Sequence, residues 1–184
     1  MKRIVSTLVI TAIAMLSALP ALAQRQRVSP HETISAVIDG NRVTVTYGRP
    51  YTIKPGTTNE VRKIWGGLVP YGQPWRMGSD EATTLITQKA LQIGDKTIPA
   101  GVYTLYMNPS ETGTSQLVFS SALGGWGIPV DTKHDVLQVD LTKESLDKPV
   151  DQFTMAVSRN SAGGGLLKLS WENTAYSVAF TVQK

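Results

Sequence analysis

The sequence predicts an all-β fold, an antiparallel β-sandwich with a jelly-roll-like strand order. Three observations favour it. Apolar and polar residues alternate along many short segments, as they do in strands with one buried and one solvent-facing side. Turn-forming residues separate these segments at intervals of roughly 10–15 residues, which is typical of sandwiches and barrels. No long window holds the 3.6-residue period of an amphipathic helix.

Alternation is clearest in the segments 43–47, 137–141, 153–157 and 176–180. In the first of these, Val43, Val45 and Tyr47 interleave with threonines. Shorter apolar runs predict further strands at residues 34–38, 83–87, 91–93, 102–107, 116–119 and 166–171. Together these segments supply enough short strands for two packed sheets.

The expected turns carry the residue types that tight turns need. Asp39-Gly40-Asn41 predicts a hairpin between the first two strands, and Gly94-Asp95-Lys96 predicts another. Pro99-Ala100-Gly101 marks a third turn. One short helical piece is expected at residues 143–146, with Thr142 as its N-cap.

Residues 48–81 depart from the strand pattern, and we call them the excursion. They contain four prolines, six glycines, two tryptophans and two tyrosines. A connection of this length inside a compact domain is uncommon and often functional. Its aromatic content is too high for a disordered linker. We therefore expect an ordered segment that covers one end or face of the sandwich.

The first 23 residues have the features of a cleaved signal peptide. Lys2 and Arg3 precede an apolar run of 16 residues, and Ala21-Leu22-Ala23 forms a small-x-small cleavage site. The run is shorter than the roughly 20 residues of a spanning helix. We expect residues 24–184 to form a single domain, periplasmic or secreted, with no membrane span after signal cleavage. The alternative is an uncleaved N-terminal anchor.

Composition excludes several function classes. The absence of cysteine excludes disulfides, thiolate zinc sites and thiol catalysis. The formal charge of +4 includes Lys2 and Arg3, so the mature chain would carry +2; with no basic stripe, this disfavours nucleic-acid binding. His31 and His134 have no ligand-like spacing, so the sequence predicts no metal and no cofactor.

Three short motifs in and after the excursion are distinctive. They are Tyr47-Gly48-Arg49-Pro50, Leu68-Val69-Pro70-Tyr71-Gly72 followed by Trp75-Arg76, and Ala100-Gly101-Val102-Tyr103. With them the chain resembles, from about Val28 onward, the bacterial exported family known as domain of unknown function 2911. The resemblance implies a secreted or periplasmic β-rich domain and supplies no catalytic residues. Departures from the family pattern are Ser79-Asp80 in place of Ala-Asn, Gln138 in place of an arginine, and a longer stretch over residues 54–63.

The excursion also holds the candidate ligand-binding residues, which are Arg49, Tyr71, Trp75, Arg76 and Glu81. An arginine fork beside aromatic rings suits carboxylates, phosphates and sugar hydroxyls. Trp65, Tyr71, Trp75 and Trp126 could likewise stack a sugar ring. The competing interpretation is structural: the arginines bond loop carbonyls and pair with Asp80 or Glu81, and the aromatic rings are core.

Two function classes remain open. The first is a non-catalytic binding or envelope-associated module for a glycan, a peptide or a small anionic ligand. The alternative is a hydrolase of envelope polymers that uses Glu81 and Asp135 as its carboxylate pair, with Arg76 orienting the substrate. Such a pair must lie roughly 5–10 Å apart on one open cleft. A third possibility is that the excursion is purely structural.

Overall fold

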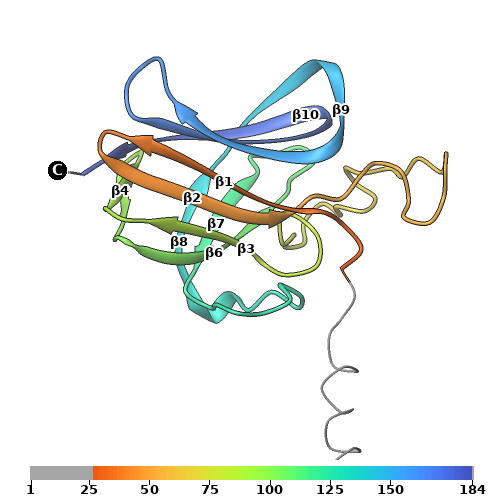
Figure 1. Ribbon diagram of the computed structural model, residues 1–184, viewed down its shortest axis with the longest axis horizontal. Coiled ribbons are helices and arrows are strands. Elements are labelled where there is room, and N and C mark those ends of the chain that lie inside the picture. Colours follow the sequence, from red (N-terminus) through yellow and green to blue (C-terminus); the bar gives the residue numbers. More distant parts are fainter. Residues whose placement is uncertain (1–26, 184) are drawn as a thin grey trace, which may run out of the picture.

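The computed structural model describes residues 27–183, and the signal peptide expected at residues 1–23 lies outside them. Two antiparallel sheets pack face to face, so the predicted all-β sandwich is confirmed (Figure 1). The first sheet contains β1 (His31–Ile38), β2 (Asn41–Gly48), β3 (Thr83–Thr87), β6 (Gly101–Asn108), β7 (Gln116–Ser120) and β8 (Asp135–Asp140). The second contains β5 (Lys96–Ile98), β4 (Leu91–Ile93), β10 (Gly165–Val182) and β9 (Thr142–Arg159). Between residues 27 and 183, no helix is long and apolar enough to cross a membrane.

The strand order of the first sheet is β1-β2-β3-β6-β7-β8, so neighbours in the sheet are mostly neighbours in the chain. This order is a meander, interrupted between β3 and β6 by the β4–β5 hairpin, which belongs to the second sheet. It is not the double Greek-key order of the jelly roll that we expected. The predicted tight turn at Asp39-Gly40 joins β1 to β2, with Asp39 and Gly40 both at positive φ.

The second sheet is dominated by the long hairpin of β9 and β10, 18 residues each. β10 merges the two strands expected at residues 166–171 and 176–180, which are joined through a bulge around Glu172. The short helix expected at residues 143–146 is wrong, because these residues lie in β9. Their backbone pairs with β10, for example Glu144 with Ala175, and this pairing outweighs a weak local helical preference. The described helix is the single 3-10 turn η2 (Thr132–His134).

The core lies between the sheets and follows the predicted alternation. Val43, Val45 and Tyr47 of β2 point inward and are at most 1% exposed. Leu105 of β6 and Phe119 of β7 complete the same layer. On the opposite sheet, inward residues of β9 and β10 include Phe153, Met155, Leu169 and Trp171. With no disulfide in the chain, this buried apolar layer carries the fold.

The excursion closes one end of the sandwich, the end opposite the C-terminus (Figure 1). It touches both sheets through isolated β-bridges, from Tyr51 to Gln152 on β9 and from Trp75 to Met107 on β6. The second bridge carries two backbone hydrogen bonds, Trp75 N–H to Met107 O at 2.7 Å and Met107 N–H to Trp75 O at 2.8 Å. Because these bonds tie the excursion to both layers, it is an ordered part of the domain.

Tyr47 gives the fold a dependence on high pH. Its hydroxyl donates to Glu32 and accepts from the Met155 amide, and burial raises the pKa of Tyr47 to about 12 from 10.0. The neutral phenol therefore contributes stability that is complete below pH 10.0 and is lost as the pH rises through about 12. We expect Tyr47→Phe to be less stable than the parent at neutral pH by about 1 kcal/mol.

The measurement is urea unfolding of both proteins across this alkaline range. The difference in unfolding free energy should shrink between the two pKa values, because only the parent loses a buried neutral hydroxyl. A difference that stays constant with pH would show that the pKa of Tyr47 is the same in the folded and unfolded states, and so is not raised by burial.

Candidate functional site

A cavity of about 370 Å³ lies between the excursion and the sandwich, and we call it the excursion cavity. The excursion supplies most of the lining: proline rings and Trp75 on one side, and the turn at residues 78–80 on another. Trp171 of β10 lines it from the sandwich. Val28 and Ser29, which precede β1 in the chain, also line it. Small-molecule sites in proteins commonly have volumes of about 300–1,000 Å³ and largely apolar walls.

The wall at residues 77–80 is a strained turn. Met77 and Asp80 adopt left-handed backbone conformations, with φ of 53° and 64°. L-residues adopt this region at a cost, which persists only where the surroundings fix it. Here Thr83 donates to the carbonyl of Met77 at 2.6 Å, and the Asp80 carboxylate accepts from the amides of Val28 and Ser29. Such strained turns cluster at ligand sites.

Close packing holds this turn against the end of β2. A Cβ atom placed on Gly48 would lie 2.1 Å from the carbonyl oxygen of Ser79. Likewise, a Cβ atom on Gly78 would lie 2.7 Å from the carbonyl oxygen of Gly48. The two backbones can approach only because both positions are glycine, and this approach sets the shape of the cavity wall.

Two arginines line the excursion cavity, and neither forms an ion pair with a carboxylate of the described residues. Arg62 donates to the carbonyl oxygens of Tyr51 and Thr52. Arg76 donates from Nη1 to the carbonyl oxygens of Asp80 and Trp126, at 2.7 and 2.9 Å. Burial lowers the pKa of both guanidinium groups, which still remain charged at neutral pH. The lining therefore sets two positive charges against the one carboxylate of Asp80.

Two polar groups in the cavity wall have no hydrogen-bond partner within residues 27–183. They are the hydroxyl of Ser79 and the indole Nε1 of Trp171, and both atoms are buried. Buried donors are nearly always satisfied in native proteins, so an unsatisfied one calls for an explanation. Each is a potential donor whose hydrogen none of residues 27–183 accepts.

The structure brings two of the five candidate residues to this cavity and leaves three outside it. Trp75 and Arg76 line it. Arg49 instead donates to the Phe153 carbonyl and to Thr154, and pairs with Glu32 at 3.1 Å. Tyr71 lies against Gly66: a Cβ atom there would be 2.9 Å from its ring. Glu81 forms an ion pair with Arg27 at 2.8 Å, and its carboxylate lies 2.9 Å from His31 Nε2.

The two tryptophan rings of the excursion belong to the core or pack against it. Trp75 is 8% exposed and packs against the rings of Phe153 and Trp171, with centroid distances of 5.1 and 6.0 Å. Trp65 packs edge-on against Trp75 and donates its indole N–H to the Trp171 carbonyl. Trp75 therefore offers one edge to the cavity. This differs from an open platform for a sugar ring.

The carboxylates of the hydrolase hypothesis have different partners. Arg27 donates to Glu81, and this hydrogen bond lowers the pKa of Glu81. Asp135 accepts a short hydrogen bond from Tyr106, and burial raises the pKa of that tyrosine. A bulge between Phe119 and Ser120 shifts the β7–β8 register, so Asp135 shares the outer face with Ser120. Neither carboxylate lines the excursion cavity. The described residues contain no cluster of three acidic or histidine side chains placed to hold a metal ion.

Sequence reasoning missed much of this lining. It did not select Arg62 as a candidate. It also did not connect Trp171 with the excursion, since more than ninety residues separate Trp171 from Trp75. It also gave no role to Ser79, which follows the glycine of a turn whose geometry depends on long-range packing. The glycine and aspartate of that turn, Gly78 and Asp80, were the available signal.

Comparison with known proteins supports the family expected from the sequence. Neither curated proteins nor solved structures give a match to this chain. The family model described as "Protein of unknown function (DUF2911)" matches residues 29–180, which include the excursion and both sheets. The chain therefore belongs to the DUF2911 family.

Proposed function

We propose that this protein is an exported, non-catalytic binding module, a single domain over residues 24–184, whose excursion cavity holds a small anionic ligand. The observation that carries the proposal is the cavity itself. Among residues 27–183, its wall combines two guanidinium groups without a carboxylate partner and two unpaired donors, Ser79 Oγ and Trp171 Nε1. Periplasmic or secreted localisation rests on the signal-like residues 1–23.

The chemistry of the wall favours an anion with several acceptor oxygens. Guanidinium groups donate to carboxylate and phosphate oxygens in paired, directional hydrogen bonds. Both guanidinium groups are already positioned by backbone carbonyl oxygens, so little side-chain entropy is lost when a ligand binds. The proline rings and Trp75 would contact the apolar part of the same ligand.

The volume favours a small molecule over a polymer. About 370 Å³ accommodates a ligand of the size of one sugar acid or one aromatic acid. Of the three ligand classes expected from the sequence, the small anion therefore fits this wall best. A glycan or a peptide would have to present a single acidic end group to it.

The arginine substitutions test this proposal. We expect Arg62→Gln and Arg76→Gln each to weaken binding of a small carboxylate by about tenfold or more, because a hydrogen bond to a charged group is lost. Calorimetric titration of the parent with benzoate, glucuronate, citrate and inorganic phosphate would first identify a bound member. Arg42→Gln is the matched control, since Arg42 is on β2, bonds only Ser35 and does not line the cavity.

Two results would contradict the proposal. One is that no member of the panel binds the parent at millimolar concentration. The other is that Arg42→Gln weakens binding as much as Arg62→Gln, which would indicate attraction by overall charge. Circular dichroism of each variant separates loss of binding from loss of fold, a concern for Arg76 because it also bonds the Trp126 carbonyl.

A further inference from the structure

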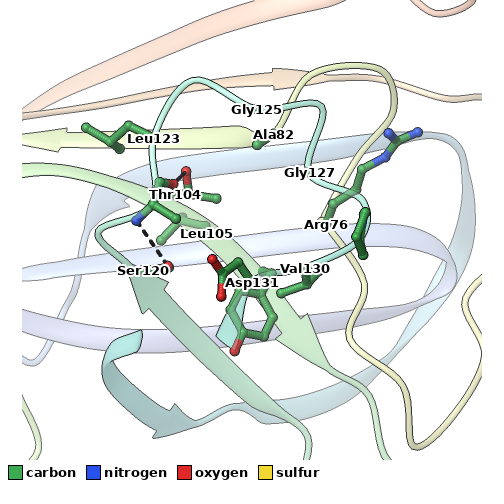
Figure 2. Close-up of a pocket in the computed structure, with 13 residues that line it drawn as sticks. Arg76, Ala82, Thr104, Leu105, Ser120, Leu123, Gly125, Gly127, Val130 and Asp131 are labelled. Atoms are coloured by element: carbon green, nitrogen blue, oxygen red, sulfur yellow. Dashed lines mark hydrogen bonds between the residues drawn. The ribbon is translucent and has the colours of Figure 1, made fainter. Parts of the chain in front are cut away.

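A second cavity, of about 130 Å³, lies outside the sandwich core, and we call it the loop cavity. It is enclosed between the outer face of β6 and β7 and the connection at residues 121–134 (Figure 2). Thr104, Tyr106 and Ser120 of the two strands form its floor. Leu123, Pro129 and Val130 of the connection form its roof.

Hydrogen bonds hold residues 122–126 of the connection to the rest of the domain. Thr104 donates to the Ala122 carbonyl at 2.6 Å, the Ala82 amide donates to the Gly125 carbonyl at 3.2 Å, and Arg76 donates to the Trp126 carbonyl. Two of its apolar side chains, Leu123 and Ile128, are 53% and 56% exposed. The result is a roofed space with mainly apolar walls.

The hydroxyl groups of the floor are already paired inside the protein. Thr104 bonds the Ala122 carbonyl, Ser120 bonds the His134 carbonyl, and Tyr106 bonds Asp135. A ligand over this floor therefore needs no matching polar groups there. Apolar cavities of this size in proteins accept a single aromatic ring.

One acidic side chain, Asp131, lines the mouth of the loop cavity, and this side chain is 51% exposed. Figure 2 shows the Asp131 carboxylate directed toward Ser120 and Thr104, across the open space, while the Arg76 guanidinium points away from it. Each Asp131 oxygen has one neighbour, the Lys133 amide at 3.0 Å and His134 Nε2 at 3.6 Å. A carboxylate can accept about four hydrogen bonds, so Asp131 can accept more.

We propose that the loop cavity binds a compact aromatic or aliphatic amine, with its apolar body on the Thr104–Tyr106–Ser120 floor and its ammonium group on Asp131. Charge and shape agree in this assignment: the one cation of the lining, Arg76, points away from the cavity, whereas the one acid, Asp131, lies half exposed at its mouth with the carboxylate directed across the open space. Arg76 lines both this cavity and the excursion cavity, but its guanidinium points away from the loop cavity, and the two proposed ligands carry opposite charges. The proposal for the loop cavity does not depend on the function proposed above.

Benzylammonium and benzoate are the probes that test this site, because they share one ring and differ in charge. Calorimetric titration of the full chain should show binding of benzylammonium. It should show no competition by benzoate, whether or not benzoate binds elsewhere. Asp131→Asn should weaken benzylammonium binding by about tenfold, because a charge-assisted hydrogen bond is lost. Asp147→Asn removes the same charge from an exposed position on β9 and should leave binding unchanged.

A second variant asks whether the ring enters the cavity. Ala82 lines the cavity, and Ala82→Leu should fill part of it and abolish benzylammonium binding. Equal binding by this variant and the parent would place the amine on the exposed rim and overturn the proposal. Absence of benzylammonium binding to the parent, or equal effects of Asp131→Asn and Asp147→Asn, would also overturn it. The probe comparison uses the parent chain and remains decisive if Ala82→Leu does not fold.

Discussion

Trp75→Ala is expected to lower the free energy of unfolding by about 3–5 kcal/mol, the usual cost of truncating a buried large aromatic residue. The indole is 8% exposed and lies among Phe153, Trp65 and Trp171, with centroid distances of 5.1, 5.8 and 6.0 Å. Removing it would leave a space where the excursion meets both sheets. The loss would therefore combine transfer free energy, cavity formation and aromatic contacts.

Equilibrium urea unfolding of the parent and the variant measures this loss. Tyr51→Ala is the matched control, because Tyr51 is also an aromatic residue of the excursion but is 47% exposed. Its removal should cost less than about 1 kcal/mol, as for most surface substitutions. Similar losses for the two variants would mean that Trp75 is not a core residue.

Gly48→Ala is expected to be strongly destabilising for a single added methyl group, with a loss of about 1–3 kcal/mol or more. Its Cβ atom would lie 2.1 Å from the Ser79 carbonyl oxygen, which belongs to the backbone and cannot rotate away. Either β2 or the turn at residues 77–80 must move. Since that turn forms a wall of the excursion cavity, ligand binding should weaken along with stability.

Gly125→Ala provides the comparison for this change. A Cβ atom at Gly125 would meet its nearest neighbour, the Gly127 nitrogen, at 3.7 Å, which is an ordinary contact distance. The variant adds the same methyl group and should be close to the parent in thermal midpoint. If Gly48→Ala and Gly125→Ala shift the midpoint equally, the close approach of residues 48 and 79 does not exist in solution.

Local alternation was enough to predict the strands but not their arrangement. The strands at residues 83–87 and 91–93 have the predicted bounds, because turn residues limit both ends. The order of strands depends on long-range pairing, which has no local signal, and so the meander was not anticipated. The wrong helix at residues 143–146 has the same origin, because polar edge-strand residues alternate too weakly to reveal a strand.

For the candidate site, composition located the region but not the direction of each side chain. Clustering of aromatic rings and arginines pointed to the excursion, and Trp75 and Arg76 do line its cavity. Arg49 belongs to the same cluster, yet it turns toward β9 and bonds the Phe153 carbonyl. Such a difference depends on which neighbour offers a carbonyl oxygen, and this is decided by tertiary packing. The competing structural interpretation, in which the arginines bond carbonyl oxygens and the aromatic rings pack in the core, therefore accounts for many of these contacts. Trp75 and Arg76 line the excursion cavity as well.

The excursion cavity exists in solution only if residues 48–81 fold together with the sandwich, and native-state hydrogen exchange tests this most directly. The Trp75 amide donates to the Met107 carbonyl on β6 at 2.7 Å. Its opening free energy should equal that of the protected amides in the β6–β7 ladder, because both should exchange only through global unfolding. Rapid exchange of the Trp75 amide, at the rate of the exposed segment around Thr57, would contradict a preformed cavity.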